Sequence, residues 1–217
     1  MIKPEGITLM KFLTEKTQVI FNELAEEILL KDFTFVGGSA ISYYLKHRLS
    51  EDLDFFTWQN ELPAILNELP KKLSRRHKVD IANISSVYAD FIIDDAKITF
   101  FANDWEVLKE NRTNIIKNIF IADLKLLCAM KINTLSLRAK YRDYYDLYVI
   151  NKEKYSLKDI YNFASFYIPG MNKKVFGMEL TYIKDIEDEN INHLYPKYQI
   201  SLTEIKKHFE TEFAKFL

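Results

Sequence analysis

The chain has 217 residues, 48% of them hydrophobic, and a formal net charge of −1. This length and apolar content are enough for a substantial core, while the near-zero net charge excludes a global field that would attract nucleic acid. Cys128 is the single cysteine, which excludes a disulfide framework and a cysteine-based metal site. The start of the chain lacks a signal-peptide core and no apolar run reaches membrane length, so we expect a cytoplasmic protein that does not enter the membrane.

The first predicted elements are a helix and a short strand. Apolar residues recur at helical spacing over residues 8–31, which predicts an amphipathic helix. The β-rich run at residues 33–36 follows it. Gly37 and Gly38 end this strand, because glycine adopts backbone angles that are closed to other residues. Ser39 is then well placed to cap a second helix, which we expect to start near residue 40.

Two aspartates lie on the next predicted strand. Asp52 and Asp54 are two residues apart, and residues at that spacing on a strand face the same side. Paired carboxylates are ligands that Mg²⁺ prefers, together with the phosphate oxygens of a nucleoside triphosphate (NTP). Gly38 and Ser39 could hold the terminal phosphates at the helix N-terminus. The alternative is that the aspartates mark a solvated strand edge and the glycines a simple turn.

A helix is predicted over residues 61–77, with Pro70 expected to break or kink it. The basic run from Lys71 to Lys78 is typical of a solvated face, and a phosphate or RNA contact is the alternative.

Residues 79–101 are predicted to be β-structure, with a hairpin turn at residues 94–96. Residues 102–121 give a mixed pattern, and we expect their last apolar residues to lead directly into a helix.

A second group of charged residues lies between residues 122 and 150. The first helix of this region carries an apolar stripe that includes Lys131. A second helix, starting near residue 139, places Arg142 and Asp143 each within a turn of Asp146. A lysine on a buried face needs a partner, which one of these aspartates or a triphosphate could supply. The alternative is an ion-pair network that joins the two helices.

The rest of the chain is predicted to be mainly helical. We expect helices over residues 157–167 and 201–216 and a partly helical segment over residues 176–186. Ser201 and Glu204 have the spacing of a capping box at the start of the last helix.

Two sequence motifs carry a family resemblance. The run V-G-G-S-A, followed by H-R-x-S-x-D-x-D-F-F at residues 47–56, resembles the signature of the polymerase-beta-like nucleotidyltransferases, and in particular of the AbiEii/AbiGii toxin family. The run from Lys131 to Tyr148 is similar to the second motif of that family. The resemblance implies a nucleotidyltransferase that uses an NTP and Mg²⁺ or Mn²⁺. It also implies a toxin with a cognate antitoxin, acting on an RNA (tRNA) or a protein.

The resemblance also implies roles for individual residues. It implies catalytic roles for two aspartates of the first motif and for a lysine and an aspartate of the second, and metal binding by the first two. The implied catalytic residues are Asp52, Asp54, Lys131 and Asp146, with the metal on Asp52 and Asp54. The implied nucleotide-binding residues are Gly37, Gly38, Ser39, Arg48, Ser50, Lys131, Arg142 and Asp143, with Arg138 and Lys140 as weaker candidates.

The same resemblance implies an α+β fold. It predicts a polymerase-beta-like core, a small mixed sheet flanked by helices, over residues 1–121. A mostly helical region, residues 122–217, would pack on this core and close a cleft.

One residue departs from the family pattern. Thr99 stands where the family commonly carries a third acid, and Asp104 is a candidate to compensate for it. This departure favours an alternative function, a nucleotide-binding regulatory module without transfer activity. A further alternative is an RNA-binding scaffold that uses residues 71–78.

Overall fold

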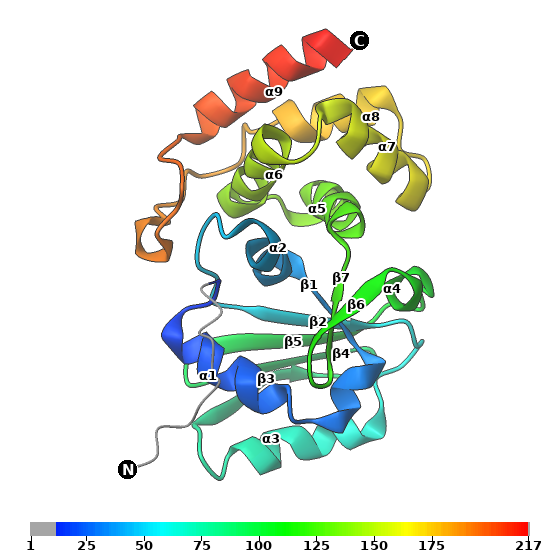
Figure 1. The fold of residues 1–217 in the computed structure, drawn as a ribbon, viewed down its shortest axis with the longest axis vertical. Coiled ribbons are helices and arrows are strands. Elements are labelled where there is room, and N and C mark those ends of the chain that lie inside the picture. The colour runs from blue at the N-terminus through cyan, green and yellow to red at the C-terminus, as the bar shows by residue number, and fades with distance from the viewer. Residues whose placement is uncertain (1–11, 217) are drawn as a thin grey trace.

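The computed structural model describes residues 12–216. Within them, a mixed sheet of seven strands forms the lower half of the molecule in Figure 1, and a group of helices forms the upper half. The strand order is β3-β4-β5-β2-β1-β7-β6. The strands are β1 (Thr34–Val36), β2 (Leu53–Thr57), β3 (Val79–Ile84), β4 (Tyr88–Ile93), β5 (Ala96–Ala102), β6 (Arg112–Ile116) and β7 (Ile119–Ala122).

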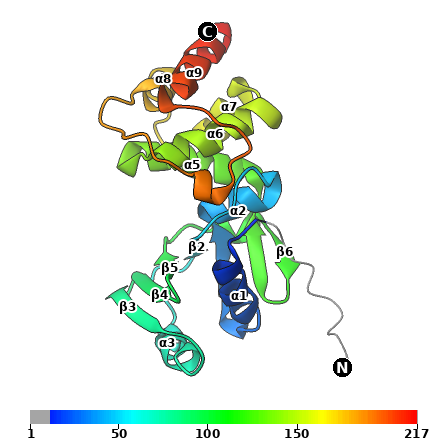
Figure 2. The ribbon, with the colours of Figure 1, turned by 90° about the vertical axis from the view of Figure 1, so that its left-hand side faces the viewer.

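The helices of the first half of the chain lie beside the sheet, and those of the second half stack above it (Figures 1 and 2). Helix α2 lies between the two groups and contacts α5 and α6. The helices are α1 (Glu15–Leu24), η1 (Ile28–Asp32), α2 (Gly37–Leu45), η2 (Ala64–Glu68), α3 (Leu69–Leu73), α4 (Val107–Glu110), α5 (Leu124–Arg138), α6 (Tyr141–Glu153), α7 (Leu157–Tyr167), α8 (Lys173–Thr181), η3 (Asn192–Leu194) and α9 (Leu202–Phe216).

The two faces of the central strands differ in chemistry. On one face, Phe35 of β1, Phe55 of β2 and Phe100 of β5 form a buried row of rings with centroids 5.3 and 5.5 Å apart. Phe21 of α1 packs on Phe35, so α1 covers this face. Side chains alternate along a strand, so Asp54 projects from the opposite face. The apolar pattern of β2 therefore fixes the side of the sheet on which Asp54 lies.

The first predicted helix is shorter than expected. Helix α1 ends at Leu24, η1 follows, and residues 8–11 of the prediction lie outside the described residues. Helical spacing would bury Ile28 together with Leu24, but Ile28 is 71% exposed and Leu30 is buried instead. The chain turns between the two elements to bring Leu30 into the core, so packing overrides the local periodicity.

The structure refines two further predictions. The helix predicted over residues 61–77 is divided into η2 and α3, and Pro70 lies in the first turn of α3, where its missing N–H group costs nothing. Residues 119–122 lead into α5 as predicted, but they do so as β7, which pairs with β6 in a hairpin. β6 is an edge strand without clean alternation of buried and exposed residues, so its sequence carries a weak strand signal. The predicted turn between β4 and β5 is confirmed, with positive φ at Asp94 and Asp95.

The C-terminal predictions hold better. Helix α7 has the predicted bounds, while α8 ends at Thr181, before the predicted limit of residue 186. The capping box at the start of α9 is confirmed, because the Ser201 N–H donates to Glu204 Oε2 at 2.9 Å and the Glu204 N–H donates to Ser201 Oγ at 3.3 Å. Cys128 is buried in α5, as expected for a core residue.

The segment between α8 and α9 returns to the loop that joins α2 to β2. The Leu49 N–H donates to the Leu194 carbonyl at 2.7 Å, and the Lys197 N–H donates to the His47 carbonyl at 2.8 Å. This contact ties the C-terminal helices to the loop that precedes Asp52.

No helix in residues 12–216 is both long and apolar enough to span a membrane. The proposed division at residue 121 stays a prediction.

Candidate active site

The acidic pair of the first motif lies at the start of β2. Asp54 is half-buried on the strand, and Asp52, just before it, is exposed. Within residues 12–216 neither carboxylate forms an ion pair. Loss of hydration and, second, the negative charge of Asp52 raise the pKa of Asp54 to about 6. Loss of hydration also raises the pKa of Asp52, although Arg142 opposes it. The protein thus holds two carboxylates together without neutralising them.

Gly37 allows the backbone to approach this pair. It has φ +75°, and a Cβ atom at this position would lie 2.1 Å from Asp54 Oδ2. Gly37 is also the first residue of α2. The first N–H groups of a helix lack partners within the helix and attract anions. The absence of a side chain at Gly37 therefore places a helix N-terminus directly against the Asp54 carboxylate.

Ser39 has a different role from the one that we predicted. Helix α2 starts at Gly37, so Ser39 lies in its first turn rather than at its cap. The buried Ser39 hydroxyl contacts Ser50 Oγ at 2.7 Å and the carbonyl oxygen of Asp52. These contacts fasten the loop before β2 to the start of α2, and so fix the position of Asp52. Nucleotide binding by Ser39 and Ser50 stays a prediction.

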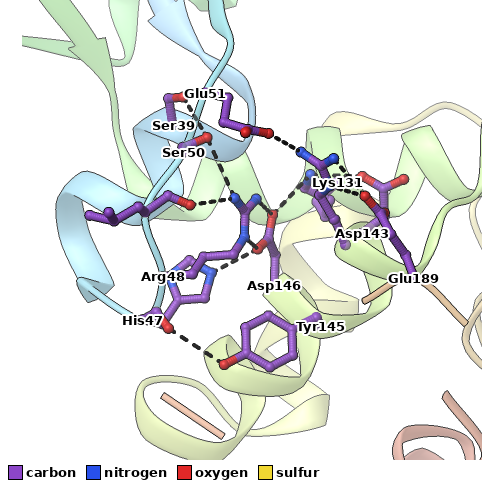
Figure 3. A network of polar contacts seen from close by, with 12 residues as sticks. Ser39, His47, Arg48, Ser50, Glu51, Lys131, Asp143, Tyr145, Asp146 and Glu189 are labelled. Atoms are coloured by element: carbon purple, nitrogen blue, oxygen red, sulfur yellow. Dashed lines mark hydrogen bonds and ion pairs between the residues drawn. The ribbon is translucent and has the colours of Figure 1, made fainter. Parts of the chain in front are cut away.

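A second charged group surrounds Asp146 of α6, and Figure 3 shows His47, Arg48 and Lys131 converging on it. Asp146 Oδ1 lies 2.7 Å from His47 Nε2 and accepts from Arg48 Nε at 2.9 Å, while Oδ2 accepts from Arg48 Nη2 at 3.1 Å and lies 3.2 Å from Lys131 Nζ. Lys131 Nζ also donates to Asp143 Oδ1 at 2.9 Å. All these residues are at most 8% exposed. The absence of a side chain at Gly38 leaves room for the Arg48 guanidinium, because a Cβ atom there would lie 2.7 Å from Arg48 Nη2.

The charges of this group stabilise one another. Burial by itself would raise the pKa of Asp146, but Arg48 and Lys131 hold it well below its usual range. Burial would lower the pKa of Lys131, but Asp143 and Asp146 raise it. Burial lowers the pKa of His47. The group is therefore a buried ion-pair network that joins α6 and α5 to the loop before β2. The predicted catalytic role of Asp146 and the predicted nucleotide contact of Arg48 stay predictions.

Two further candidates, Arg142 from the predicted nucleotide-binding residues and Arg138 from the weaker ones, lie outside the contacts around Asp146. Arg142 donates to Glu189 Oε1 at 2.7 Å and to Glu51 Oε2 at 3.2 Å, so two carboxylates already bind the guanidinium that we expected to bind nucleotide. Arg138 is close enough to Asp54 to lower the pKa of that carboxylate, as is Lys131. The structure therefore brings the positive charge of α5 to the acidic pair.

Thr99 lies beside Asp54, where the third acid was expected. The parallel register of β2 and β5 pairs Asp54 with Thr99, and the antiparallel register of β5 and β4 pairs Thr99 with Asp90. Asp104 is exposed, well beyond this position on the chain that follows β5. Among the described residues there is no cluster of three or more acidic, histidine or cysteine side chains able to hold a metal. The hypothesis that Asp104 completes the metal site is therefore wrong.

The basic run from Lys71 to Lys78 is neutralised in large part by the protein itself. Its ion pairs link α3 and β3 to acidic residues of neighbouring elements. They are Lys72–Glu27, Arg76–Glu23, His77–Glu23, His77–Asp94 and Lys78–Asp80. The partners Glu23 and Glu27 belong to α1 and the turn after it, on the covered side of the sheet, so this run does not extend the candidate site.

Sequence analysis missed two residues near the site. Glu51 and Glu189 are the partners of Arg142, and no local pattern in the sequence joins residues so far apart. The position of Asp90 follows from the sequence, because the predicted turn at residues 94–96 implies the pairing of Asp90 with Thr99.

Comparisons with known proteins agree with this fold. A protein family described as nucleotidyl transferase AbiEii toxin, type IV TA system, matches residues 18–117, which include Gly37, Asp52, Asp54 and Thr99. The resemblance predicted from the motifs is confirmed by this match. An uncharacterized protein of Aquifex aeolicus, aq_aa25, is 25% identical over 190 residues, which cover 87% of this chain and 90% of that protein.

Solved structures show the same fold. JHP933 from Helicobacter pylori has a TM-score of 0.56 and 17% identity, and the similarity covers 94% of this chain and 92% of that one. The MenT4 nucleotidyltransferase toxin from Mycobacterium tuberculosis has a TM-score of 0.55 and 12% identity, over 93% of this chain and 85% of that one. These similarities confirm the predicted α+β nucleotidyltransferase fold with its helical C-terminal half.

Proposed function

We propose that this chain transfers a nucleoside monophosphate from an NTP to a hydroxyl group of an acceptor. One observation carries the proposal: the unneutralised pair of Asp52 and Asp54 lies against the N-terminus of α2, where Gly37 has no side chain. The match of residues 18–117 to a nucleotidyltransferase family supports it. The pair offers negative charge for a metal and the helix N-terminus offers donors for phosphate, which together are what a metal–triphosphate complex requires.

The acidic pair fits a divalent cation. Burial and, second, the charge of Asp52 raise the pKa of Asp54, although Lys131, Arg138 and Lys97 oppose this shift, so a cation at the pair would relieve the remaining repulsion. Mg²⁺ and Mn²⁺ are hard cations that bind carboxylates and phosphate oxygens. Asp52 and Asp54 would hold the ion. When bound, it would neutralise charge on the phosphates during transfer.

The chain's own residues would position the substrate. The backbone N–H groups at Gly37 and Gly38 are available at the start of α2 for the β- and γ-phosphates. Lys131, whose charge reaches Asp54, would add positive potential from the opposite wall. The acceptor oxygen would then bond to the α-phosphorus, the bond from that phosphorus to the bridging oxygen would break, and pyrophosphate would leave. Catalysis of this kind consists mainly of positioning and charge stabilisation.

The sheet face beside Asp54 favours an RNA acceptor. Phe56, Phe101 and Tyr88 form a row of half-buried rings on β2, β5 and β4, with neighbouring centroids 5.1 and 6.2 Å apart. Aromatic rings on a sheet face can stack with unpaired bases. By the description of the matching family, the protein would be the toxin of a toxin–antitoxin pair, with a cognate antitoxin as partner. Among RNA acceptors, tRNA is a candidate.

Thr99 favours a second candidate function. A hydroxyl lacks the negative charge of a carboxylate, so the site provides less charge than a pair of metal ions requires. Such a protein would bind an NTP with a metal ion and act as a regulatory module without transferring the nucleotide.

A labelling experiment separates these functions. Purified protein would be incubated with each labelled NTP, Mg²⁺ or Mn²⁺, and either total RNA or total protein, next to an Asp54→Asn variant. We expect label in RNA from the wild type and none from the variant. Label in protein instead of RNA would change the acceptor class. NTP binding without transfer would support the regulatory module, and the absence of both transfer and binding would overturn both functions.

A further inference from the structure

A polar row crosses three strands next to the acidic pair. Asp54, Thr99 and Asp90 are in register on β2, β5 and β4, and residues in register on adjacent strands project from the same face of a sheet. Their strand neighbours Phe55, Phe100 and Ala89 are buried on the other face. The third carboxylate that is missing at Thr99 is therefore present one strand further away.

Asp90 is held in place by donors on both of its oxygens. Thr99 Oγ1 donates to Asp90 Oδ1 at 2.6 Å. Asp90 Oδ2 accepts from Tyr88 Oη at 2.7 Å and lies 2.8 Å from Lys97 Nζ. Asp90 and Thr99 are each only 7% exposed. The carboxylate cannot turn away from Thr99 without losing these contacts.

The same group is electrostatically linked to the acidic pair. The positive charge of Lys97 acts on both sets of carboxylates, because it also opposes the rise in the pKa of Asp52 and of Asp54. Thr99 is the residue in direct register with Asp54. An acceptor hydroxyl could approach a phosphate held at Asp54 across this face of the sheet. On that path Thr99 is the neighbouring residue.

The Thr99 hydroxyl has one hydrogen and two acceptor lone pairs. Since its hydrogen is directed to Asp90, its lone pairs can accept from another donor. The Tyr88 hydroxyl lies next to it, but directs its own hydrogen to Asp90 Oδ2. We propose that Thr99 receives the proton of the attacking acceptor hydroxyl and passes its own proton to Asp90, so that the two residues together replace the missing third carboxylate. This inference rests on the proposed function.

The proton and electron balance of this step is complete. The acceptor oxygen forms a bond to the α-phosphorus, and the bond to the bridging oxygen breaks with its electron pair leaving on pyrophosphate. The acceptor proton moves to Thr99 Oγ1 while the Thr99 proton moves to Asp90 Oδ1. Asp90 is protonated at the end of the step and returns its proton to solvent. Thr99 is the catalytic residue of the pair, and Asp90 is the positioning residue and proton acceptor.

Three variants test the relay. Thr99→Val keeps the shape of the side chain without its hydroxyl, Thr99→Ser keeps the hydroxyl, and Asp90→Asn keeps an acceptor oxygen that cannot take up a proton. We expect Thr99→Val and Asp90→Asn each to lower kcat by about 10²-fold, the typical contribution of general acid–base catalysis, with little change in the KM for NTP. Thr99→Ser should remain within a few-fold of wild type. Because the two residues act as one unit, the double variant should be no slower than either single variant.

Two further readouts separate the relay from a structural or metal-binding role. Binding of Mn²⁺, measured by electron paramagnetic resonance, should be equal in wild type and Thr99→Val, because the hydroxyl is not a metal ligand in this proposal. The solvent deuterium isotope effect on kcat should be present in wild type and reduced in Thr99→Val.

Two variants serve as matched controls. Asp80→Asn changes a carboxylate on the neighbouring strand β3, which pairs with Lys78, and Thr113→Val changes an exposed threonine on β6.

The outcomes are distinct. Thr99→Val with wild-type kcat overturns the relay even if Asp90→Asn fails to fold. A loss of Mn²⁺ binding in Thr99→Val, or additive losses in the double variant, also overturns it. A wild-type protein that transfers no nucleotide overturns the proposed function and this inference with it, whereas active wild type with active Thr99→Val overturns this inference alone.

Discussion

The two charged groups of this protein are built on opposite principles. The strand pair, Asp52 and Asp54, has no ion-pair partner among residues 12–216, and the pKa of both carboxylates is raised. The helix group is buried, each of its charged side chains has an ion-pair partner, and the pKa of Asp146 is held well below its usual range. Both groups come from motifs that resemble one family, yet the first is left open for a ligand and the second is closed on itself.

In the proposed function, the open pair contacts the metal and the substrate, while the closed group joins parts of the chain. The partners of Asp146 come from the loop before β2 and from α5, so its ion pairs join the helical half to the strand that carries the acidic pair. We therefore expect activity at Asp54 to depend on the ion pairs of Asp146. Variants in each group should differ in whether they change folding, activity or both.

The largest effect is expected for Asp146→Asn. Removing this charge leaves Arg48 buried without its carboxylate, and breaking a buried ion pair costs about 3–5 kcal/mol. We expect the free energy of unfolding in urea to fall by this amount and activity to be lost with it. Asp143→Asn is the matched control on the same helix, because it leaves both Arg48 bonds in place. An Asp146→Asn protein of wild-type stability would show that the network does not join the two halves.

The opposite pattern is expected for Asp54→Asn. Loss of activity on the order of 10³-fold is expected from removing one preorganised electrostatic group. The folded state should become more stable, by up to roughly 1 kcal/mol after allowance for solvent screening, because the variant removes a carboxylate whose ionised form is disfavoured. Transfer from a labelled NTP measures the activity. Thermal unfolding with and without Mg²⁺ measures the stability and the binding of the ion, which should stabilise the wild type and leave the variant unchanged. Destabilisation of the variant would contradict the view that this pair is strained.

The sequence was sufficient to predict the open group and, within the closed group, the pairing of Lys131 with aspartates of the next helix, but not the part taken by His47 and Arg48. The strand, the glycine turn and the aspartate spacing are local patterns, and the structure places Gly37 against Asp54 as one compact unit. The partners of Asp146 and Arg142 come from parts of the chain far from them in sequence, and no spacing rule connects these parts. Ser39 was assigned to a cap because the start of α2 was placed too late, an error of a few residues that changed its role.

The third prediction concerns the close approach of backbone and carboxylate. Gly37→Ala introduces a Cβ atom 2.1 Å from Asp54 Oδ2 at a φ of +75°. The left-handed backbone costs about 1–2 kcal/mol for a residue with a side chain, and the clash must in addition displace Asp54. Gly170→Ala is the matched control, since Gly170 has φ +80° and no neighbour within 4 Å. We expect similar backbone strain in both variants, but weaker Mn²⁺ binding only in Gly37→Ala. Equal Mn²⁺ binding in both would show that Asp54 tolerates the displacement.

The smallest effect is a pH dependence within the closed group. Burial lowers the pKa of His47, while Asp146 opposes this shift and Arg48 and Lys131 add to it. The unfolded chain, with an ordinary histidine pKa of about 6.5, then binds more protons than the folded chain below that pH. The contribution of neutral His47 to stability is therefore complete above about pH 6.5 and is lost as the pH falls further.

Urea unfolding of wild type and His47→Gln over about pH 5 to 7 measures this contribution. His77, whose pKa is raised, has the opposite pH dependence, but it is present in both proteins and cancels in their difference. We expect the wild type to lose more stability than His47→Gln on acidification, by at most about 1.4 kcal/mol per pH unit for one proton. Parallel curves would mean that His47 is protonated when folded. In that case three cations, and not two with a neutral imidazole, would surround Asp146.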